Sequence, residues 1–154
     1  MLLLTFRVAK DAYAVDASQV VEVVPRVSLR AVPHSPPYLA GMFHYRDTIA
    51  PVVDLSVLMG AGRCSNRLST RIILVQAPVA GRAQALLGLM AERVDDLRSV
   101  TKEQAVFPAM PMPDAPYLGP IIQSDDLLVQ MIAVDRVIPD TLRNALVVET
   151  SEAR

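Results

Sequence analysis

Proline and glycine divide this sequence at close spacing, a pattern that favours many short strands and few helices. Twelve of the 154 residues are proline, four of them between residues 25 and 37 and five between residues 107 and 120. Because proline has no backbone N–H group, it occurs in turns, on edge strands or in the first turn of a helix. The two proline-rich segments are therefore expected to form loops and edge strand, and the rest of the chain to form short elements.

Between these interruptions, runs of β-branched and large apolar residues predict short strands. Two segments have helical character: Leu55–Met59, which follows the favourable N-cap Asp54, and Pro139–Leu146, where proline suits the first turn. The pattern predicts an all-β protein built of small barrels. The expected strands are Leu2–Ala9, Ala12–Asp16, Val20–Val24, the two arms of a hairpin between 41 and 53, Thr70–Gln76, Ala85–Met90, Val94–Val100, Ile121–Ile122 and Leu127–Ile132.

Length and composition limit the class of protein. At 154 residues, 52% of them apolar, the chain has the size of one domain and enough apolar sequence to bury a core. A net charge of -1 argues against nucleic-acid binding, which depends on an excess of lysine and arginine. Arg7 and Lys10 break the first apolar run, so neither a signal peptide nor a membrane span is expected there.

The residues that enzymes use for catalysis are sparse. His34 and His44 lack the spacing and flanking acids typical of a metal site, so neither a metal nor a cofactor is expected. Cys64 is the single cysteine, which excludes an internal disulfide and favours the reducing cytoplasm. Its neighbour Arg63 favours the thiolate form, but without a base nearby we interpret Cys64 as a surface thiol. No catalytic residue is predicted; a small β-barrel enzyme or ligand binder that uses both histidines and the cysteine is the alternative.

One hairpin carries a charged pair that its neighbours do not explain. The segment Phe43–Leu55, FHYRDTIAPVVDL, has two extended runs that meet at Arg46 and Asp47. Aspartate tolerates the left-handed backbone that tight turns require and bonds to nearby backbone, so Asp47 has a structural reason to be there. Arg46 has none. It is therefore either a solvated charge or an anchor for a partner protein, a role in which arginine is over-represented.

Four motifs follow one another in a specific order along the chain. They are Y-A-V-D at Tyr13–Asp16, V-V-E-V at Val20–Val23, P-x-x-P-P-Y-L-A-G-M at Pro33–Met42 and H-Y-R-D-T-I-A-P-V-V-D-L at His44–Leu55. This succession resembles the CheW-like family of chemotaxis coupling domains, in which Y-G-I-D, V-x-E-I, P-x-[FY]-[IV]-x-G-V and N-L-R-G-x-[IV]-x-P-[IV]-[VI]-D-L recur. Three later segments match the family more loosely, so that the resemblance covers nearly the whole chain: Val94–Val100, Tyr117–Gly119 and Leu127–Val137.

The resemblance implies one CheW-like domain over residues 1–146 and a tail over 147–154. Its fold is expected to be two small five-stranded SH3-like β-barrels packed on a shared core, with short helical turns and a short C-terminal helix. Its function is expected to be that of a non-catalytic adaptor. Such an adaptor couples the cytoplasmic helical hairpin of a chemoreceptor to a CheA-type histidine kinase, whose regulatory domain has the same fold. The protein is then cytoplasmic and recruited to membrane-associated receptor arrays.

The same resemblance assigns receptor binding to Val20, Glu22, Gly41 and Arg46, and leaves the kinase-contact face and self-association open. The residue types suit that role. A guanidinium offers directional donors to acids and carbonyls on a helical hairpin, valine offers apolar contact, and glycine permits close backbone approach.

Some positions depart from the family motifs. Asp47 replaces a turn glycine, Ala14 replaces a glycine, and His44-Tyr45 replaces Asn-Leu. These departures favour a coupling protein of a divergent or alternative array, and they leave open whether its output is motility, surface sensing or second-messenger control. A structural array component that binds mainly the kinase regulatory domain is the alternative within the family.

Overall fold

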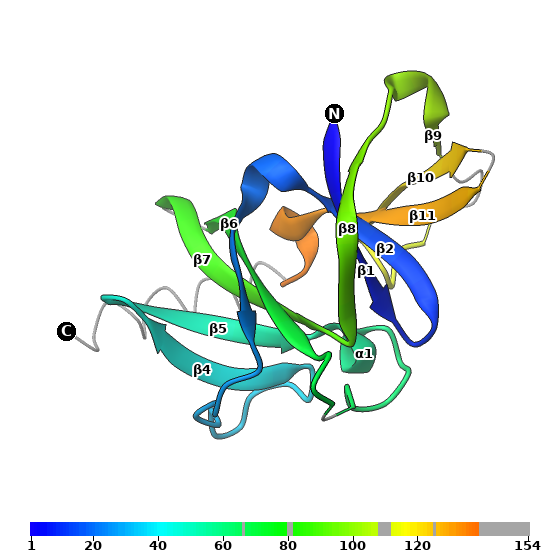
Figure 1. Ribbon diagram of the computed structural model, residues 1–154. Helices are drawn as coiled ribbons and strands as arrows, with labels where there is room; N and C mark the ends of the chain where they lie inside the picture. The colour runs from blue at the N-terminus through cyan, green and yellow to red at the C-terminus, as the bar shows by residue number, and fades with distance from the viewer. Residues whose placement is uncertain (66, 80–81, 108–111, 125, 139–154) are drawn as a thin grey trace.

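The computed structural model of the protein describes residues 1–65, 67–79, 82–107, 112–124 and 126–138 (Figure 1). Within these ranges the chain forms eleven strands and only short helical segments, which confirms the all-β prediction. The helix expected over Pro139–Leu146 and the tail over 147–154 lie outside the described residues. The helical segments are α1 (Leu55–Leu58) and the 3-10 turns η1 (Ala17–Gln19), η2 (Lys102–Gln104) and η3 (Val134–Arg136).

The strands form two sheets, and the chain starts in the first, passes through the second and returns. The first sheet has the order β8-β1-β2-β11-β10-β9 and the second the order β3-β6-β7-β5-β4. The two units are therefore intertwined, since each end of the described chain belongs to the same sheet. The first contains β1 (Leu2–Val8), β2 (Asp11–Asp16), β8 (Arg93–Ser99), β9 (Ala105–Val106), β10 (Leu118–Ser124) and β11 (Leu127–Ile132); the second contains β3 (Val20–Pro25), β4 (Leu39–Tyr45), β5 (Thr48–Asp54), β6 (Arg71–Val79) and β7 (Arg82–Ala91).

The first sheet has six strands where five were expected. The additional strand is β9, whose two residues follow η2 and pair with Ile121 and Ile122 of β10. A strand of two residues has no periodicity that the sequence can reveal. The division into two β units is otherwise as predicted.

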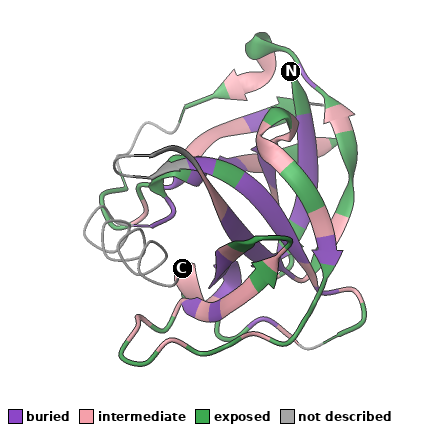
Figure 2. Cartoon of the chain, turned by 90° about the vertical axis from the view of Figure 1, so that its left-hand side faces the viewer, coloured by how far each residue is buried: buried purple, intermediate pink, exposed green. Residues whose placement is uncertain are grey.

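A shared apolar core lies between the two sheets. Phe6 of β1, Ile73 of β6 and Leu89 of β7 belong to it and are fully buried. Each large apolar side chain buried in this way stabilises the fold by roughly 1.5–3 kcal/mol. Figure 2 shows that most buried residues lie on strands, whereas the connecting loops are mainly exposed or of intermediate burial.

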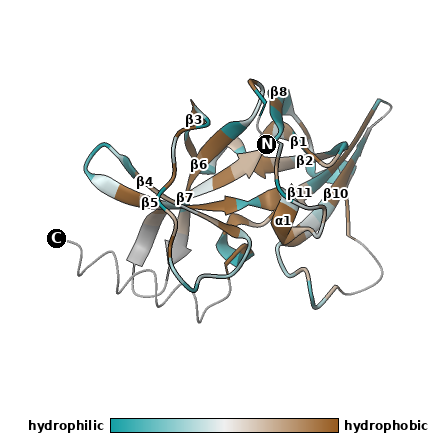
Figure 3. Cartoon of the chain, turned by 90° about the horizontal axis from the view of Figure 1, so that it is seen from below, coloured by the Kyte–Doolittle hydropathy of each residue, from teal (hydrophilic) through white to brown (hydrophobic). Residues whose placement is uncertain are grey.

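Each sheet also has a smaller core on its other face. Val24, Val52 and Ile72 belong to the one in the second sheet, and Leu3 and Ile122 to the one in the first. Both cores are consistent with sheets that curl toward closed barrels, because only a curled sheet encloses its second face. Figure 3 shows hydrophobic residues along the strands and a hydrophilic tip on the β4–β5 hairpin.

The second sheet is closed by the chain that follows β3. Arg30 forms an isolated antiparallel bridge with Met42 of β4, with N–H···O distances of 2.8 and 2.9 Å in the two directions. Gly41 lies in a β-bulge at this place and has a φ of +149°. A Cβ atom on Gly41 would lie 2.7 Å from the carbonyl oxygen of Arg30, so only glycine permits the two backbones to approach this closely.

Helix α1 begins at Leu55, directly after the predicted N-cap Asp54, and its last helical residue is Leu58. The Asp54 carboxylate accepts hydrogen bonds from the backbone N–H groups of Ser56 and Val57, which are otherwise without intrahelical partners. The helix ends before Gly60, whose φ of +80° suits a glycine. Among the described residues, no helix is long and apolar enough to cross a membrane.

Candidate protein-interaction site

The β4–β5 hairpin has a two-residue turn made of Arg46 and Asp47. Tyr45 and Thr48 form the pair that closes it. The residue with the left-handed backbone is Arg46, at a φ of +55°, and not Asp47 as the sequence predicted. Arginine in this conformation is strained by about 1 kcal/mol or more. The turn thus fixes the direction in which Arg46 leaves the backbone, and its side chain is 79% exposed.

Glu22 of β3 reaches the same hairpin from the opposite edge of the sheet. Its Oε1 atom accepts a hydrogen bond of 2.6 Å from the hydroxyl of Tyr45. The same oxygen lies 4.0 Å from Nη2 of Arg46, at the outer limit of an ion pair. Cζ of Arg46 lies 5.3 Å from the centroid of the Tyr45 ring, within the range of a cation–π contact. We name Glu22, Tyr45 and Arg46 the hairpin cluster.

The pKa of Tyr45 is raised, chiefly because its hydroxyl donates to the Glu22 carboxylate; the positive charge of Arg46 acts in the opposite direction. Tyr45 therefore keeps its proton at neutral pH and remains the donor in this hydrogen bond. The Arg46 side chain is 79% exposed, and its guanidinium suits an acceptor such as a carboxylate or a carbonyl on another protein.

The other two expected site residues are not part of this cluster. A register shift between Val20 and Glu22 turns Val20 to the shared core, against which its half-buried side chain packs. Gly41 is buried in the barrel closure beside Arg30, so the backbone that approaches it closely belongs to this chain. The sequence pattern missed Tyr45, although its alternation with Phe43 already indicated that both side chains share one face of β4.

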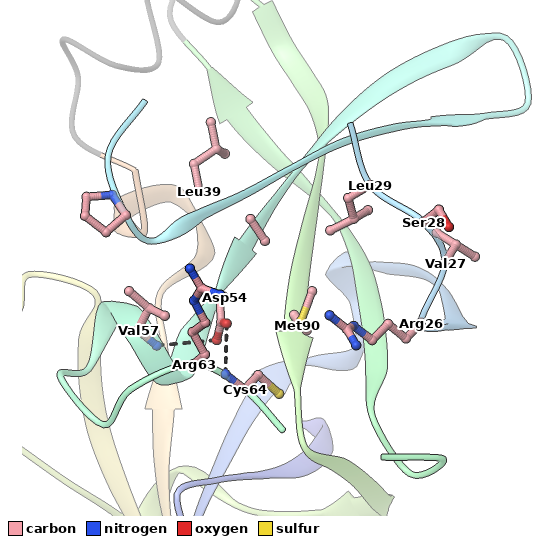
Figure 4. Close-up of a pocket in the computed structure, with 12 residues that line it drawn as sticks. Arg26, Val27, Ser28, Leu29, Leu39, Asp54, Val57, Arg63, Cys64 and Met90 are labelled. Carbon is pink, nitrogen blue, oxygen red and sulfur yellow. Dashed lines mark hydrogen bonds between the residues drawn. The ribbon is translucent and has the colours of Figure 1, made fainter. Parts of the chain in front are cut away.

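Cys64 is buried and not a surface thiol, contrary to the prediction. The second carboxylate oxygen of Asp54 accepts the backbone N–H of Cys64 at 2.9 Å, which holds this loop against the second sheet. Figure 4 shows the two residues beside a pocket of about 610 Å³ that Arg26, Arg63 and Met90 also line.

The chemistry of the Cys64 thiol follows from this position. Burial and, to a lesser extent, the negative charges of Asp54 and Glu92 raise its pKa from 9.0 to about 11. The sequence predicted that a neighbouring arginine would lower this pKa. That prediction is wrong, because the net shift is upward. At neutral pH the thiol is protonated, which makes it a poor nucleophile.

The histidines do not add a reactive site to Cys64. His34 lies in the loop before β4 and His44 on β4, and both are exposed. Within the described part of the chain, no group of three or more His, Cys, Asp or Glu side chains is placed to hold a metal ion.

Comparison with known proteins gives a consistent result. A family model described as the CheW-like domain matches residues 2–142. A probable chemotaxis protein CheW from Rhizobium etli is 28% identical over 101 residues, which are 66% of this chain and 62% of that protein, less than two thirds of its length. Chemotaxis protein CheW from Rhizobium meliloti is 24% identical over 149 residues, which cover 93% of this chain and 90% of the relative.

A solved structure has a similar fold. The crystal structure of the scaffolding protein TtCheW from Thermoanaerobacter tengcongensis superposes with a TM-score of 0.78 at 25% sequence identity. The superposition covers 90% of this chain and 87% of that chain. The similarity therefore extends through both β units.

Proposed function

Because the chain belongs to the CheW-like domain family, we propose that it is a non-catalytic adaptor in a bacterial chemotaxis-type signalling array. It joins the cytoplasmic helical hairpin of a chemoreceptor to a CheA-type histidine kinase. The observation that carries this proposal is the family match over residues 2–142. The similarity to a scaffolding protein with the same two β units supports it.

The proposed receptor contact is made by the hairpin cluster. Arg46 is its centre, because the guanidinium is exposed and the turn fixes its base. Glu22 contributes a carboxylate that is 45% exposed. A receptor tip is a pair of helices, whose surface carboxylates and terminal carbonyls are acceptors for the N–H groups of arginine.

We propose that Val20 and Gly41 support receptor binding indirectly, because they position the two strands that carry the hairpin cluster. Val20 fixes the start of β3 against the shared core, two residues before Glu22. Gly41 permits the barrel closure on β4, the strand that ends at Tyr45. Substitution of either residue would therefore move the strand that carries a member of the hairpin cluster.

The test is co-sedimentation of the purified protein with receptor-containing membranes and the kinase. We expect Arg46→Glu to weaken association by about tenfold or more, because charge reversal opposes an acidic partner at the centre of the contact. Arg67→Glu is the matched control, since Arg67 is also an exposed arginine in a loop and lies outside the hairpin cluster. Unchanged sedimentation of the Arg46 variant would remove this residue from the receptor contact.

Separate pull-downs test binding to each of the two partners. The adaptor binds both a receptor-tip fragment and a fragment of the kinase regulatory domain. Binding to the kinase fragment alone would identify the protein as a structural component of the array. Binding to neither fragment would refute the proposed function.

A further inference from the structure

We propose that Tyr45 is a positioning residue that keeps Arg46 available to its partner, by engaging Glu22 and by supporting the guanidinium on its ring. This inference rests on the proposed function, because the partner is the receptor tip. The family motif has leucine at the position of Tyr45, so this device is a feature of the present chain.

The first step of the argument is competition for one carboxylate oxygen. Oε1 of Glu22 lies 2.6 Å from the Tyr45 hydroxyl and 4.0 Å from Nη2 of Arg46. A short hydrogen bond to an ionised acceptor is stronger than a long, exposed ion pair. Glu22 is therefore committed mainly to Tyr45. Without the hydroxyl, the carboxylate has only Arg46 as a neighbouring donor in the hairpin cluster and would draw the guanidinium inward.

The second step concerns the mobility of the arginine. Its Cζ atom lies over the Tyr45 ring at 5.3 Å, and the ring itself packs against the core of the second sheet. An exposed arginine normally samples many rotamers, and ordering them opposes binding. Because packing fixes the ring, its contact with Arg46 restricts these rotamers before the partner binds and so reduces the entropy that is lost on binding. The positive φ at Arg46 adds a fixed direction to the base of the side chain.

These two contributions predict the chemistry of the partner group. Cζ of the guanidinium lies over the Tyr45 ring, 5.3 Å from its centroid, and the Arg46 side chain as a whole is 79% exposed. Its free N–H groups form a planar fork, which matches a carboxylate better than a single carbonyl. We therefore infer that the receptor tip presents an aspartate or glutamate to Arg46.

The binding experiment uses the full chain and a purified receptor-tip fragment that contains the helical hairpin, with fluorescence anisotropy as the measurement. Tyr45→Phe keeps the ring and removes the hydroxyl, and we expect it to weaken binding about three- to tenfold. Glu22→Gln provides the matched background. In that background Tyr45→Phe has an effect of about twofold or less, because no charged carboxylate is left to draw Arg46 inward.

A second measurement uses the free protein and does not depend on the receptor. The side-chain Nε–H resonance of Arg46 is followed by NMR in the wild type, Tyr45→Phe and Tyr45→Leu, with Arg67 as internal reference. We expect Tyr45→Leu to remove the ring-current shift and increase the mobility of Arg46. Tyr45→Phe retains the ring-current shift but moves the resonance toward that of an arginine paired with a carboxylate.

The outcomes separate the two proposals. If the wild type binds the receptor tip and Tyr45→Phe weakens binding equally in both backgrounds, or in neither, the positioning role is refuted and the adaptor function stands. If the wild type does not bind the receptor tip, the proposed coupling to a receptor fails and the NMR measurement still decides the positioning role. An Arg46 resonance that is the same in all three proteins would refute that role on its own.

Discussion

The hydroxyl of Tyr45 and the carboxylate of Glu22 are joined by a 2.6 Å hydrogen bond that connects the two edge strands of the second sheet. The five strands in the order β3-β6-β7-β5-β4 must curl for this contact to form. The curl brings Glu22 of β3 to Tyr45 at the end of β4 and places Arg46 beside both residues. The proposed interaction site is therefore a consequence of barrel closure.

Loss of the Tyr45 hydroxyl should affect stability little. The bond between Tyr45 and Glu22 is exposed, so water can replace either partner when the bond is lost. We expect Tyr45→Phe to leave the urea midpoint of unfolding nearly unchanged. Urea unfolding followed by circular dichroism measures this. A clearly lower midpoint would mean that the hydroxyl acts on the fold and not on the site.

Gly41→Ala should destabilise the protein strongly. The added methyl carbon would lie 2.7 Å from the Arg30 carbonyl oxygen and 2.9 Å from Cβ of Leu29, at a backbone φ that alanine disfavours. The Arg30–Met42 bridge must then open or shift, and we expect a loss of about 2–4 kcal/mol in the free energy of unfolding. Urea unfolding provides the measurement.

Gly60→Ala is the control for this experiment. Gly60 also has a positive φ, of +80°, but an added Cβ would meet no atom within 4 Å. Gly60→Ala therefore introduces backbone strain without a steric clash, and we expect it to lower the free energy of unfolding by about 1 kcal/mol. Equal losses at Gly41 and Gly60 would contradict the close approach at the barrel closure.

Asp54→Asn should loosen the loop that contains Cys64. An asparagine oxygen can still cap α1, but its amide group would face the backbone N–H of Cys64, which now donates to the carboxylate. The asparagine amide and the backbone N–H of Cys64 are both donors, so neither has an acceptor in this buried position. We expect the free energy of unfolding to fall by about 1–3 kcal/mol. Asp16→Asn is the matched control. Asp16 caps η1 through Ser18 at an exposed position, so its loss should be smaller.

Cys64 should react slowly in the folded protein. Its thiol is buried and its pKa is raised to about 11, so little thiolate is present at pH 8. We expect alkylation by iodoacetamide to be at least about tenfold slower in buffer than in urea. Mass spectrometry measures the alkylated fraction. Asp54→Asn should accelerate the reaction in buffer, because it releases the loop.

The same thiol makes stability depend on pH in the alkaline range. Between pH 9 and 11 the unfolded chain loses the thiol proton while the folded chain keeps it. The unfolded state then binds fewer protons, so the free energy of unfolding falls as pH rises through this window. Cys64→Ala should remove this part of the pH dependence. A parallel pH profile of the variant and the wild type would contradict the raised pKa.

Much of the local structure is predictable from neighbouring residues. The strand runs, the helical turn at Leu55, the Asp54 cap and the β4–β5 hairpin follow from periodicity, capping and turn chemistry, and each was confirmed. The sequence did not predict the two-residue strand β9, because this strand depends on its partner β10 and has no residue pattern of its own. The family motifs likewise lie in continuous segments.

The errors occur where packing, and not the adjacent sequence, decides the surroundings or the backbone of a residue. Cys64 stands in a polar loop by sequence, but the Asp54 carboxylate ten residues away holds it in a buried position. The left-handed turn residue is Arg46 because the hairpin must match the curl of its sheet, which the preferences of Asp47 do not reveal.

The amino-acid order alone thus specified short strands, their turns and the membership in a family, since each depends on residues within a few positions of one another. Strand order, the bulge at Gly41 and the meeting of Glu22 with Tyr45 and Arg46 became visible only in three dimensions. The physical reason is that closure of a sheet depends on the twist of all its strands added together, which cannot be derived from the residues of any one segment.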